Sequence, residues 1–99
     1  MTYAFTYDVP ISDEIYGRIK AGLGTQRPDG MIAHLAWRIE GGLRYVDVWE
    51  SKEQSEAFAD ERLHPVVHPL LEELLGFVPP EPDRVVLEVI DAWTSQHPA

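Results

Sequence analysis

The sequence predicts an α+β fold of the ferredoxin-like type, with elements in the order β-α-β-β-α-β around a four-stranded antiparallel sheet. The central observation is a hairpin: residues 30–51 contain two runs rich in aromatic and branched side chains, separated by Gly41 and Gly42. The second observation concerns the segments on either side of the hairpin. A predicted strand and helix precede it, and predicted helical segments and a last strand follow it. A chain of 99 residues is expected to form one domain over residues 1–99.

The segment before the hairpin alternates over Tyr3–Val9, which predicts a first strand that Pro10 ends. Ser12 or Asp13 is placed to cap the helix that follows. Gly22 and Gly24 suit the end of that helix, because glycine adopts a left-handed backbone at little cost.

The two hairpin strands are predicted over Met31–Ile39 and Leu43–Glu50. Gly41 and Gly42 suit a two-residue turn in which both central residues have φ > 0. Because side chains alternate between the faces of a strand, the turn decides which residues share a face. The predicted register places three pairs opposite one another: His34 and Trp49, Ala36 and Asp47, and Arg38 and Tyr45.

The two faces of this hairpin differ in polarity. One face mixes aromatic, imidazole, carboxylate and guanidinium groups. The other is apolar throughout, and in a small chain such a face is most simply covered by a second copy. The sequence therefore predicts a homodimer through the apolar face, with these residues at the contact: Leu35, Trp37, Val46 and Val48.

After the hairpin, Ser51 and Gln54 have the spacing of a capping box and predict a helix over Lys52–Leu63. The segment His64–Pro69 is expected to interrupt this helix, because each of its prolines removes an amide donor. The remaining elements are expected to be a second helical piece from Pro69 to Gly76, a rigid connector over Phe77–Asp83, a final strand over Arg84–Trp93 and a frayed tail over Ser95–Ala99.

Composition argues against several classes of function. Lys and Arg number 8 and Asp and Glu number 17, and the net charge of −9 argues against a nucleic-acid or anionic-membrane partner. The chain has no cysteine, which excludes disulfides, thiolate metal sites and cysteine nucleophiles. No apolar run reaches the roughly 18 residues that a membrane span needs. The N-terminal residues do not resemble a signal peptide, so a cytoplasmic protein is expected.

Two hairpin residues carry groups suited to acid–base chemistry. Because imidazole as a group titrates near neutral pH, a histidine such as His34 would serve as a general base or as a hydrogen-bond partner of a substrate. It would equally serve as a core histidine bonded to Asp47 or to a backbone carbonyl. Asp47 on a covered strand needs a partner, which His34 or Arg38 would supply. A catalytic pair and a purely structural pair both stay open at this point.

The other candidates would contact a ligand rather than react with it. Tyr45 and Trp49 suit stacking against an aromatic substrate, and both are also common core residues. His64 and His68 lie four residues apart, a spacing that can bind a metal on a helix. The prolines between and after them, and the lack of an evident third ligand, argue against a metal site. No phosphate loop, serine elbow or zinc motif occurs, so no metal, flavin, nicotinamide or other cofactor is expected.

The hairpin end VDVWES, the helix running into ERLHP and the proline-rich segment before the last strand resemble the dimeric α/β-barrel superfamily. Within it, the antibiotic biosynthesis monooxygenase-like group is the most similar, over about Tyr3 to Trp93. The resemblance implies that two sheets pack face to face across a dimer and that each subunit holds a pocket between sheet and helices. It also implies a range of activities, from cofactor-independent quinone-forming monooxygenases and haem-degrading enzymes to isomerases.

The match to the pocket residues of this group is partial. Trp49 lies where the quinone-forming and haem-degrading members carry a pocket tryptophan. The quinone-forming members have an asparagine four residues earlier, where this chain has Tyr45. The haem-degrading members use a first-strand asparagine and a histidine about ten residues after the tryptophan. This chain has no asparagine in that strand and has Ala59 at the later position, so haem degradation is not expected.

Two functions are consistent with these residues. The first is a small enzyme acting on a hydrophobic, aromatic or polyketide-like molecule, with His34 removing a phenolic or α-carbonyl proton. Isomerisation or cyclisation needs only this proton transfer, whereas oxygenation needs a substrate carbanion that reacts with dioxygen. The rival is a non-catalytic ligand-binding or structural dimer, which a filled face beside His34 would favour. The residues assigned to the pocket or its lid on the first hypothesis are His34, Tyr45, Asp47, Trp49, Arg38, His64 and His68.

Overall fold

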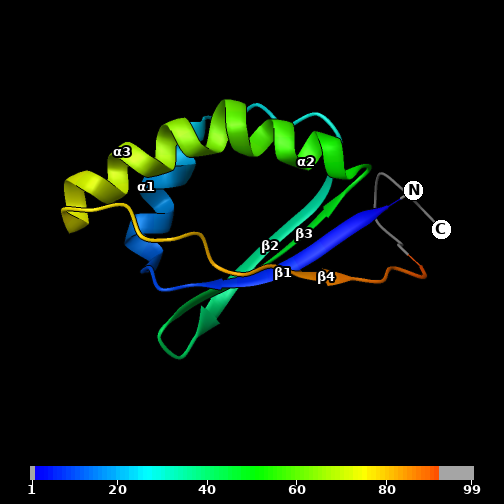
Figure 1. Cartoon of the computed structure of the whole chain (residues 1–99), viewed down its shortest axis with the longest axis horizontal. Helices are drawn as coiled ribbons and strands as arrows, with labels where there is room; N and C mark the ends of the chain where they lie inside the picture. Colours follow the sequence, from blue (N-terminus) through cyan, green and yellow to red (C-terminus); the bar gives the residue numbers. More distant parts are fainter. Residues whose placement is uncertain (1, 92–99) are drawn as a thin grey trace.

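Four antiparallel strands form one sheet, and the helices lie on a single face of it (Figure 1). The computed structural model describes residues 2–91. This arrangement confirms the predicted α+β class. The elements are β1 (Tyr3–Val9), α1 (Asp13–Leu23), β2 (Met31–Ile39), β3 (Gly42–Trp49), α2 (Lys52–Phe58), a π-helical turn η1 (Ala59–Leu63), α3 (His64–Leu75) and β4 (Val85–Leu87).

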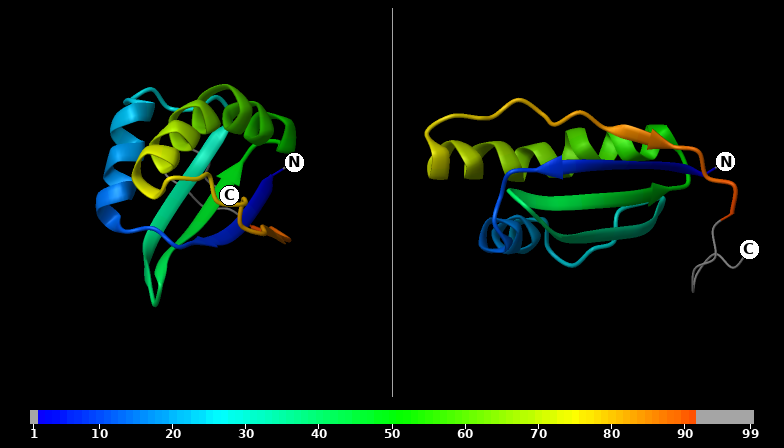
Figure 2. Two further views of the ribbon diagram at one scale, coloured as in Figure 1. Left: turned by 60° about the vertical axis from the view of Figure 1, so that its left-hand side comes forward. Right: turned by 90° about the horizontal axis from the view of Figure 1, so that it is seen from below.

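The strand order is β2-β3-β1-β4, which is the order of ferredoxin-like folds. Figure 2 shows α1 and α3 side by side over the sheet, with α2 over its far end. The connector that leaves α3 runs back along that helix before it enters the sheet as β4. Segments far apart in the sequence therefore meet between α3 and the strands.

The first helix forms as predicted. Ser12 caps α1, because its side-chain oxygen accepts a hydrogen bond from the Ile15 amide. Asp13 and Glu14 in the first turn complement the positive end of the helix dipole. The helix ends at Gly24, whose φ of 80° is unfavourable for residues with a side chain, whereas Gly22, also expected at the end, still lies inside α1.

The predicted hairpin register is wrong by two residues. The turn consists of Glu40 and Gly41, and His34 lies opposite Asp47. Gly41 supplies the one positive φ of this turn, at 86°. Gly42 already belongs to β3, where an added Cβ would lie 2.0 Å from the Val9 carbonyl oxygen. A shift of two keeps the alternation of side chains, so the predicted faces hold while the predicted pairs do not.

The prolines do not interrupt the second helical segment, contrary to the prediction. α2, η1 and α3 follow one another without a break, and Pro69 lies inside α3 rather than at its start. In η1 the backbone widens, and the His64 amide donates to the Ala59 carbonyl five residues back. The wider turn relieves the conflict between the Pro65 ring and the carbonyl four residues earlier. The helix ends at Gly76 as predicted, with a left-handed φ of 82°.

The last strand is shorter than the predicted Arg84–Trp93. β4 covers Val85–Leu87, and its final residue pairs with Ala4 near the start of β1. β1 offers almost no strand beyond that pair, so residues 88–91 leave the sheet. Residues 92–99, which include the end of the predicted strand and the predicted tail, lie outside the described part of the chain.

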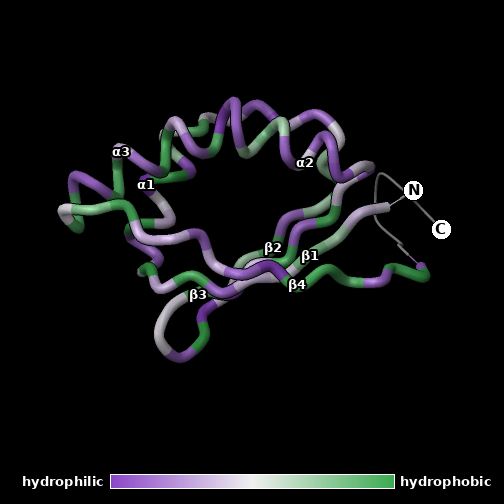
Figure 3. The backbone as a smooth tube through the Cα atoms, in the orientation of Figure 1, coloured by the Kyte–Doolittle hydropathy of each residue, from purple (hydrophilic) through white to green (hydrophobic). Residues whose placement is uncertain are grey.

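The helices cover the polar and aromatic face of the sheet. Trp49 and Phe5 are its most buried large side chains, at 1% and 2% exposure. The opposite face leaves Leu35 and Trp37 exposed in the single chain. Figure 3 shows that β4 is hydrophobic and that α3 alternates between hydrophobic and hydrophilic residues, as an amphipathic helix does. Among the described residues, no helix is both long and apolar enough to cross a membrane.

Candidate active site

A cavity of about 220 Å³ lies between the sheet and the helices. Its walls come from β1, β2, β3, α1, the segment from α2 to α3, and the connector before β4. Leucine, isoleucine, valine and proline side chains make up much of the lining. Polar and charged side chains in the walls include Tyr7, Tyr16, His34, Tyr45, Asp47, His64, His68, Glu81 and Arg84.

His34 is the centre of a hydrogen-bonded chain of three side chains. Its Nδ1 atom lies 2.5 Å from Asp47 Oδ1, and its Nε2 atom lies 2.8 Å from the Tyr16 hydroxyl. The pairing of β2 with β3 holds His34 and Asp47 directly opposite each other, and α1 supplies Tyr16. Neighbouring strands and a covering helix therefore build one continuous chain from Asp47 through His34 to Tyr16.

The Asp47 carboxylate decides where the hydrogens of this chain lie. An ionised carboxylate only accepts hydrogen bonds, so His34 Nδ1 carries the proton and donates it to Asp47. In the neutral imidazole Nε2 is then unprotonated and accepts a hydrogen bond from the Tyr16 hydroxyl. Asp47 is 7% exposed, and in such surroundings a hydrogen bond to a charged group is strong. The arrangement is that of a general base oriented by a carboxylate, with a phenol at its accepting nitrogen.

Tyrosine rings gather around this imidazole. Tyr45 meets His34 edge-on, with ring centroids 5.4 Å apart, and it contacts Tyr16 at 5.6 Å and Tyr7 at 5.0 Å. Burial raises the pKa of each of the three phenols above the ordinary value of 10.0, and the Asp47 carboxylate raises each pKa further. All three therefore stay neutral at neutral pH and act as hydrogen-bond donors or acceptors rather than as phenolates.

Arg84 adds a positive charge to the same wall. Its guanidinium lies 4.4 Å from the Phe5 ring centroid and 5.5 Å from that of Tyr7. These cation–π contacts hold the charge over the aromatic side of the cavity. A guanidinium so placed favours an anionic group on a bound molecule.

The structure brings five predicted site residues to the cavity. His34 and Asp47 are bonded to each other, and Tyr45 packs against the imidazole. His64 and His68 reach the cavity from α3. Their imidazole rings stack on each other, with centroids 4.7 Å apart.

Two other predicted site residues do not line the cavity. Trp49 belongs to the core, where its ring packs against Phe58 at 5.5 Å between centroids. Arg38 lies at the surface, with 78% of its side chain exposed, and its guanidinium pairs with Asp13 at 2.5 Å. Neither is placed to contact a ligand beside His34. The cause is the hairpin register, which puts Asp47 rather than Trp49 opposite the histidine.

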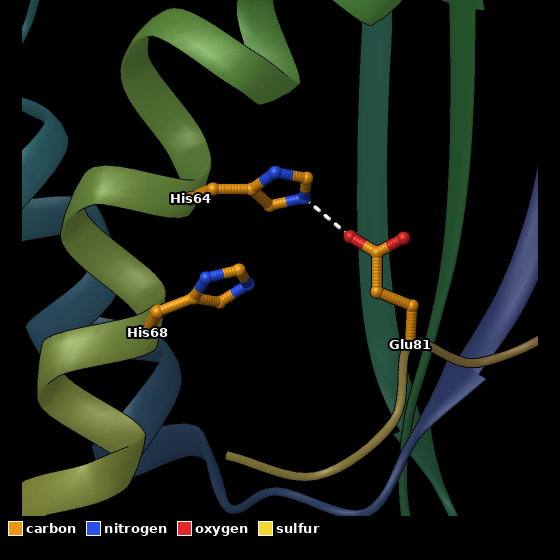
Figure 4. A group of neighbouring side chains, drawn as sticks. All are labelled: His64, His68 and Glu81. Carbon is orange, nitrogen blue, oxygen red and sulfur yellow. Dashed lines mark ion pairs between the residues drawn. The ribbon is translucent and has the colours of Figure 1, made fainter.

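Sequence reasoning missed several cavity residues, among them Tyr16, Glu81 and Arg84. Tyr16 had a signal, since it lies three residues before Ile19 and shares the apolar face of its helix. Arg84 and Glu81 had none, because their place in the cavity depends on how the connector folds back. Glu81 forms an ion pair with His64 Nε2 and stands beside both α3 histidines (Figure 4). The expectation that the histidine pair lacks a third ligand-type neighbour is therefore wrong.

Comparison with known proteins supports the fold. No protein-family model matches the chain, and no curated protein matches its sequence. The structure of Rv0793 from Mycobacterium tuberculosis has a TM-score of 0.60 at 13% identity, over 95% of this chain and 100% of that one. SnoaB, a cofactor-independent oxygenase from Streptomyces nogalater, has a TM-score of 0.54 at 13% identity, over 92% and 93%. At such identities the likeness is one of fold, and it is consistent with the dimeric α/β-barrel resemblance.

Proposed function

We propose that the protein is a small enzyme that removes a proton from a hydrophobic, aromatic or polyketide-like molecule bound in the cavity. The observation that carries this proposal is the chain from Asp47 through His34 to Tyr16 in the wall of a cavity with an apolar lining. A histidine that merely completed the core would be packed on all sides. The open cavity beside His34 favours the enzyme over the structural alternative.

The proton leaves the substrate through Tyr16 in this proposal. The Tyr16 oxygen takes the phenolic or α-carbonyl proton as its own proton passes to His34 Nε2, over the 2.8 Å that separate the two atoms. His34 becomes an imidazolium, and the Asp47 carboxylate at 2.5 Å stabilises that charge. The electron pair stays on the substrate as an enolate or phenolate.

Arg84 would stabilise this anion. Its guanidinium stands in the cavity wall and carries the charge that a developing oxyanion needs. The neutral phenol of Tyr45 lines the same wall and adds a hydrogen-bond donor. Base and oxyanion partners therefore come from separate side chains, as a proton abstraction next to a carbonyl requires.

The size of the cavity limits the substrate. Ligand pockets for drug-sized molecules have volumes of about 300–1,000 Å³. A cavity of about 220 Å³ lies below that range and suits a molecule with a single ring or with two fused rings. Its apolar lining favours a carbon skeleton with few polar groups.

The substrate anion can react in two ways, and these define two possible overall reactions. Returning the proton at another carbon gives isomerisation or ring closure, with no further reactant. Alternatively the carbanion bonds to dioxygen, takes up a proton as a hydroperoxide and loses water to leave a carbonyl, with dioxygen as the oxidant. The fold shared with SnoaB, which is described as a cofactor-independent oxygenase, is the reason to test the second outcome.

Proton exchange tests the first step alone. β-Tetralone is a bicyclic ketone with a CH₂ between an aromatic ring and a carbonyl, and it is incubated with the protein in D₂O under nitrogen. We expect wild type to accelerate loss of the proton signal in NMR, and His34→Gln to lower that acceleration by about 100-fold or more. Glu73→Gln, which changes an exposed residue of α3, is the matched control and should exchange as wild type does.

The outcomes separate the enzyme from a binding protein. Fluorescence quenching by the same ketone reports binding independently of exchange. Binding without accelerated exchange would refute the enzyme and favour a ligand-binding role. Repeating the assay in air with an oxygen electrode then distinguishes oxygenation, which consumes dioxygen, from isomerisation, which does not.

A further inference from the structure

We propose that His64, His68 and Glu81 form a binding site for a divalent transition-metal ion in the wall of the cavity. Figure 4 shows both imidazoles projecting from α3 toward the Glu81 carboxylate on the connector. One ligand atom from each residue lies within 4.8 Å of the others. Nothing in the proposed proton abstraction uses these three side chains.

The distances suit an ion of the size of zinc. Zinc–nitrogen and zinc–oxygen bonds are about 2.0–2.2 Å long, so ligand atoms around a tetrahedral ion stand about 3.3 Å apart. The ligand atoms stand within 4.8 Å of one another, so side-chain rotation would have to close the remaining difference. The His64 and Glu81 side chains are 26% and 60% exposed, which leaves room for this movement and a path for the ion.

The backbone around each ligand is restrained. His64 follows the π-helical turn, and His68 lies one helical turn further along the same face. Glu81 stands between Pro80 and Pro82, whose rings limit the conformations of the connector. Restrained ligands lose little entropy when an ion binds.

The ligand set favours one class of ion. Two imidazoles and one carboxylate suit zinc or ferrous iron, whereas Mg²⁺ and Ca²⁺ prefer sites made of oxygen atoms. Three protein ligands leave a coordination position for water or a substrate oxygen. Asp60 supports the site, since its carboxylate lies 3.7 Å from His64 Nδ1 and would orient the ring once Nε2 holds the metal.

Calorimetry on tag-free, chelator-treated protein tests the site directly. We expect one Zn²⁺ or Co²⁺ per chain and no binding of Mg²⁺. Losing a residue that only hydrogen-bonds to a metal ligand lowers metal affinity by about 10–100-fold. His64→Gln and His68→Gln remove a ligand itself, so each should lower zinc affinity by more than that. His34→Gln is the matched control, a histidine of the same cavity whose loss should leave zinc affinity unchanged. Absence of stoichiometric zinc binding, or equal affinity in all three variants, would overturn the proposal.

A thiolate ligand gives a second, spectroscopic test. The chain has no cysteine, so His68→Cys introduces its one thiol. Because thiolates bind cobalt and zinc, this variant should keep Co²⁺ binding and add a thiolate-to-cobalt charge-transfer band in the near ultraviolet. Glu73→Cys on the exposed face of α3 is the control and should show no such band. A His68→Cys protein that stays folded by circular dichroism yet shows no band would also count against the site.

Metal binding is measured here without any turnover. The β-tetralone exchange is run with chelator present, so its result depends on His34 and not on this site. Failure of one proposal therefore leaves the other standing.

Discussion

His34 and Asp47 depend on each other because both are largely covered and each supplies the main polar partner of the other. A carboxylate at 7% exposure without a hydrogen-bond donor would be costly to bury. The imidazole meets that need on one side and presents its second nitrogen to Tyr16 on the other. His34 thus stabilises the sheet and, in the proposed function, would also act in the chemistry of the cavity.

Asp47→Asn is expected to lower the free energy of unfolding by about 1–3 kcal/mol, because the partly buried Nδ1–H of His34 loses its charged acceptor. Urea denaturation at neutral pH measures this change. In the double variant with His34→Gln, the cost should differ from the sum of the single costs by about 0.5–3 kcal/mol, as expected for residues in direct contact. Strict additivity would show that the two side chains do not interact.

The phenols near His34 predict a loss of stability in alkali. Burial raises the pKa of Tyr7, Tyr16 and Tyr45, so these phenols ionise more readily in the unfolded chain than in the folded one. Their contribution to stability is therefore complete below about pH 10 and declines as pH rises above it. Urea denaturation at pH 8 and at pH 11 should show the decline, and Tyr45→Phe should make it shallower. An equal slope in wild type and variant would contradict the assignment.

At the scale of elements, the contact between α1 and α3 closes one side of the cavity. An added Cβ at Gly22 would lie 2.6 Å from a methyl group of Val66, whereas Gly17 on the same helix has nothing within 4 Å. Both glycines lie inside α1, but only Gly22 faces α3 closely enough that the absence of a side chain lets the two helices approach. Substituting each glycine in turn therefore distinguishes the effect of helix propensity, at Gly17, from the effect of packing between α1 and α3, at Gly22.

Gly17→Ala is expected to stabilise the protein by about 0.5–1 kcal/mol, the usual gain for alanine over glycine inside a helix. Gly22→Ala should instead destabilise by about 1–3 kcal/mol, because the branched Val66 side chain has little rotamer freedom to move away. Thermal melts of both variants measure the difference. Adding Val66→Ala to Gly22→Ala should recover part of the loss; no recovery would mean that α1 and α3 do not meet there.

At the scale of the whole molecule, the face of the sheet that the helices leave uncovered exposes large apolar side chains to solvent. Leu35 and Trp37 are 61% and 44% exposed, and Val85 on β4 is 60% exposed. These residues lie on the two edge strands β2 and β4, and exposed aliphatic and aromatic side chains gathered on one face of a sheet mark an interaction surface. We propose that a second copy of the chain covers this face, as the dimeric α/β-barrel resemblance implies.

Leu35→Arg is expected to abolish that dimer, because it buries a charge without a partner at the contact. The residue is largely exposed in the single chain, so the fold itself should survive, as circular dichroism will report. Sedimentation equilibrium should give a dimer for wild type and a monomer for the variant. Thr25→Arg in an exposed loop adds the same charge elsewhere and should stay dimeric. A wild-type monomer at all concentrations would end the proposal.

Patterns that act over a few residues were readable from the sequence. The Ser12 and Ser51 caps, the glycine ends of α1 and α3 and the alternation of β1 all depend on neighbours within one turn or one strand. The two faces of the hairpin were also predictable, since a register error of two residues leaves the alternation unchanged. These local signals were enough for the fold class and for placing His34 and Asp47 on the same face.

Tertiary structure alone decided which distant groups meet. The turn at Glu40 and Gly41 put Asp47 opposite His34, and packing of α1 over the sheet added Tyr16. The return of the connector along α3 brought Glu81 to the histidine pair. The hydrogen bonds of His34 join residues 13 and 18 positions apart, separations at which the sequence alone does not show which side chains meet. They depend on how whole elements pack, because the free energy that selects them is gained only when the sheet and helices are assembled together.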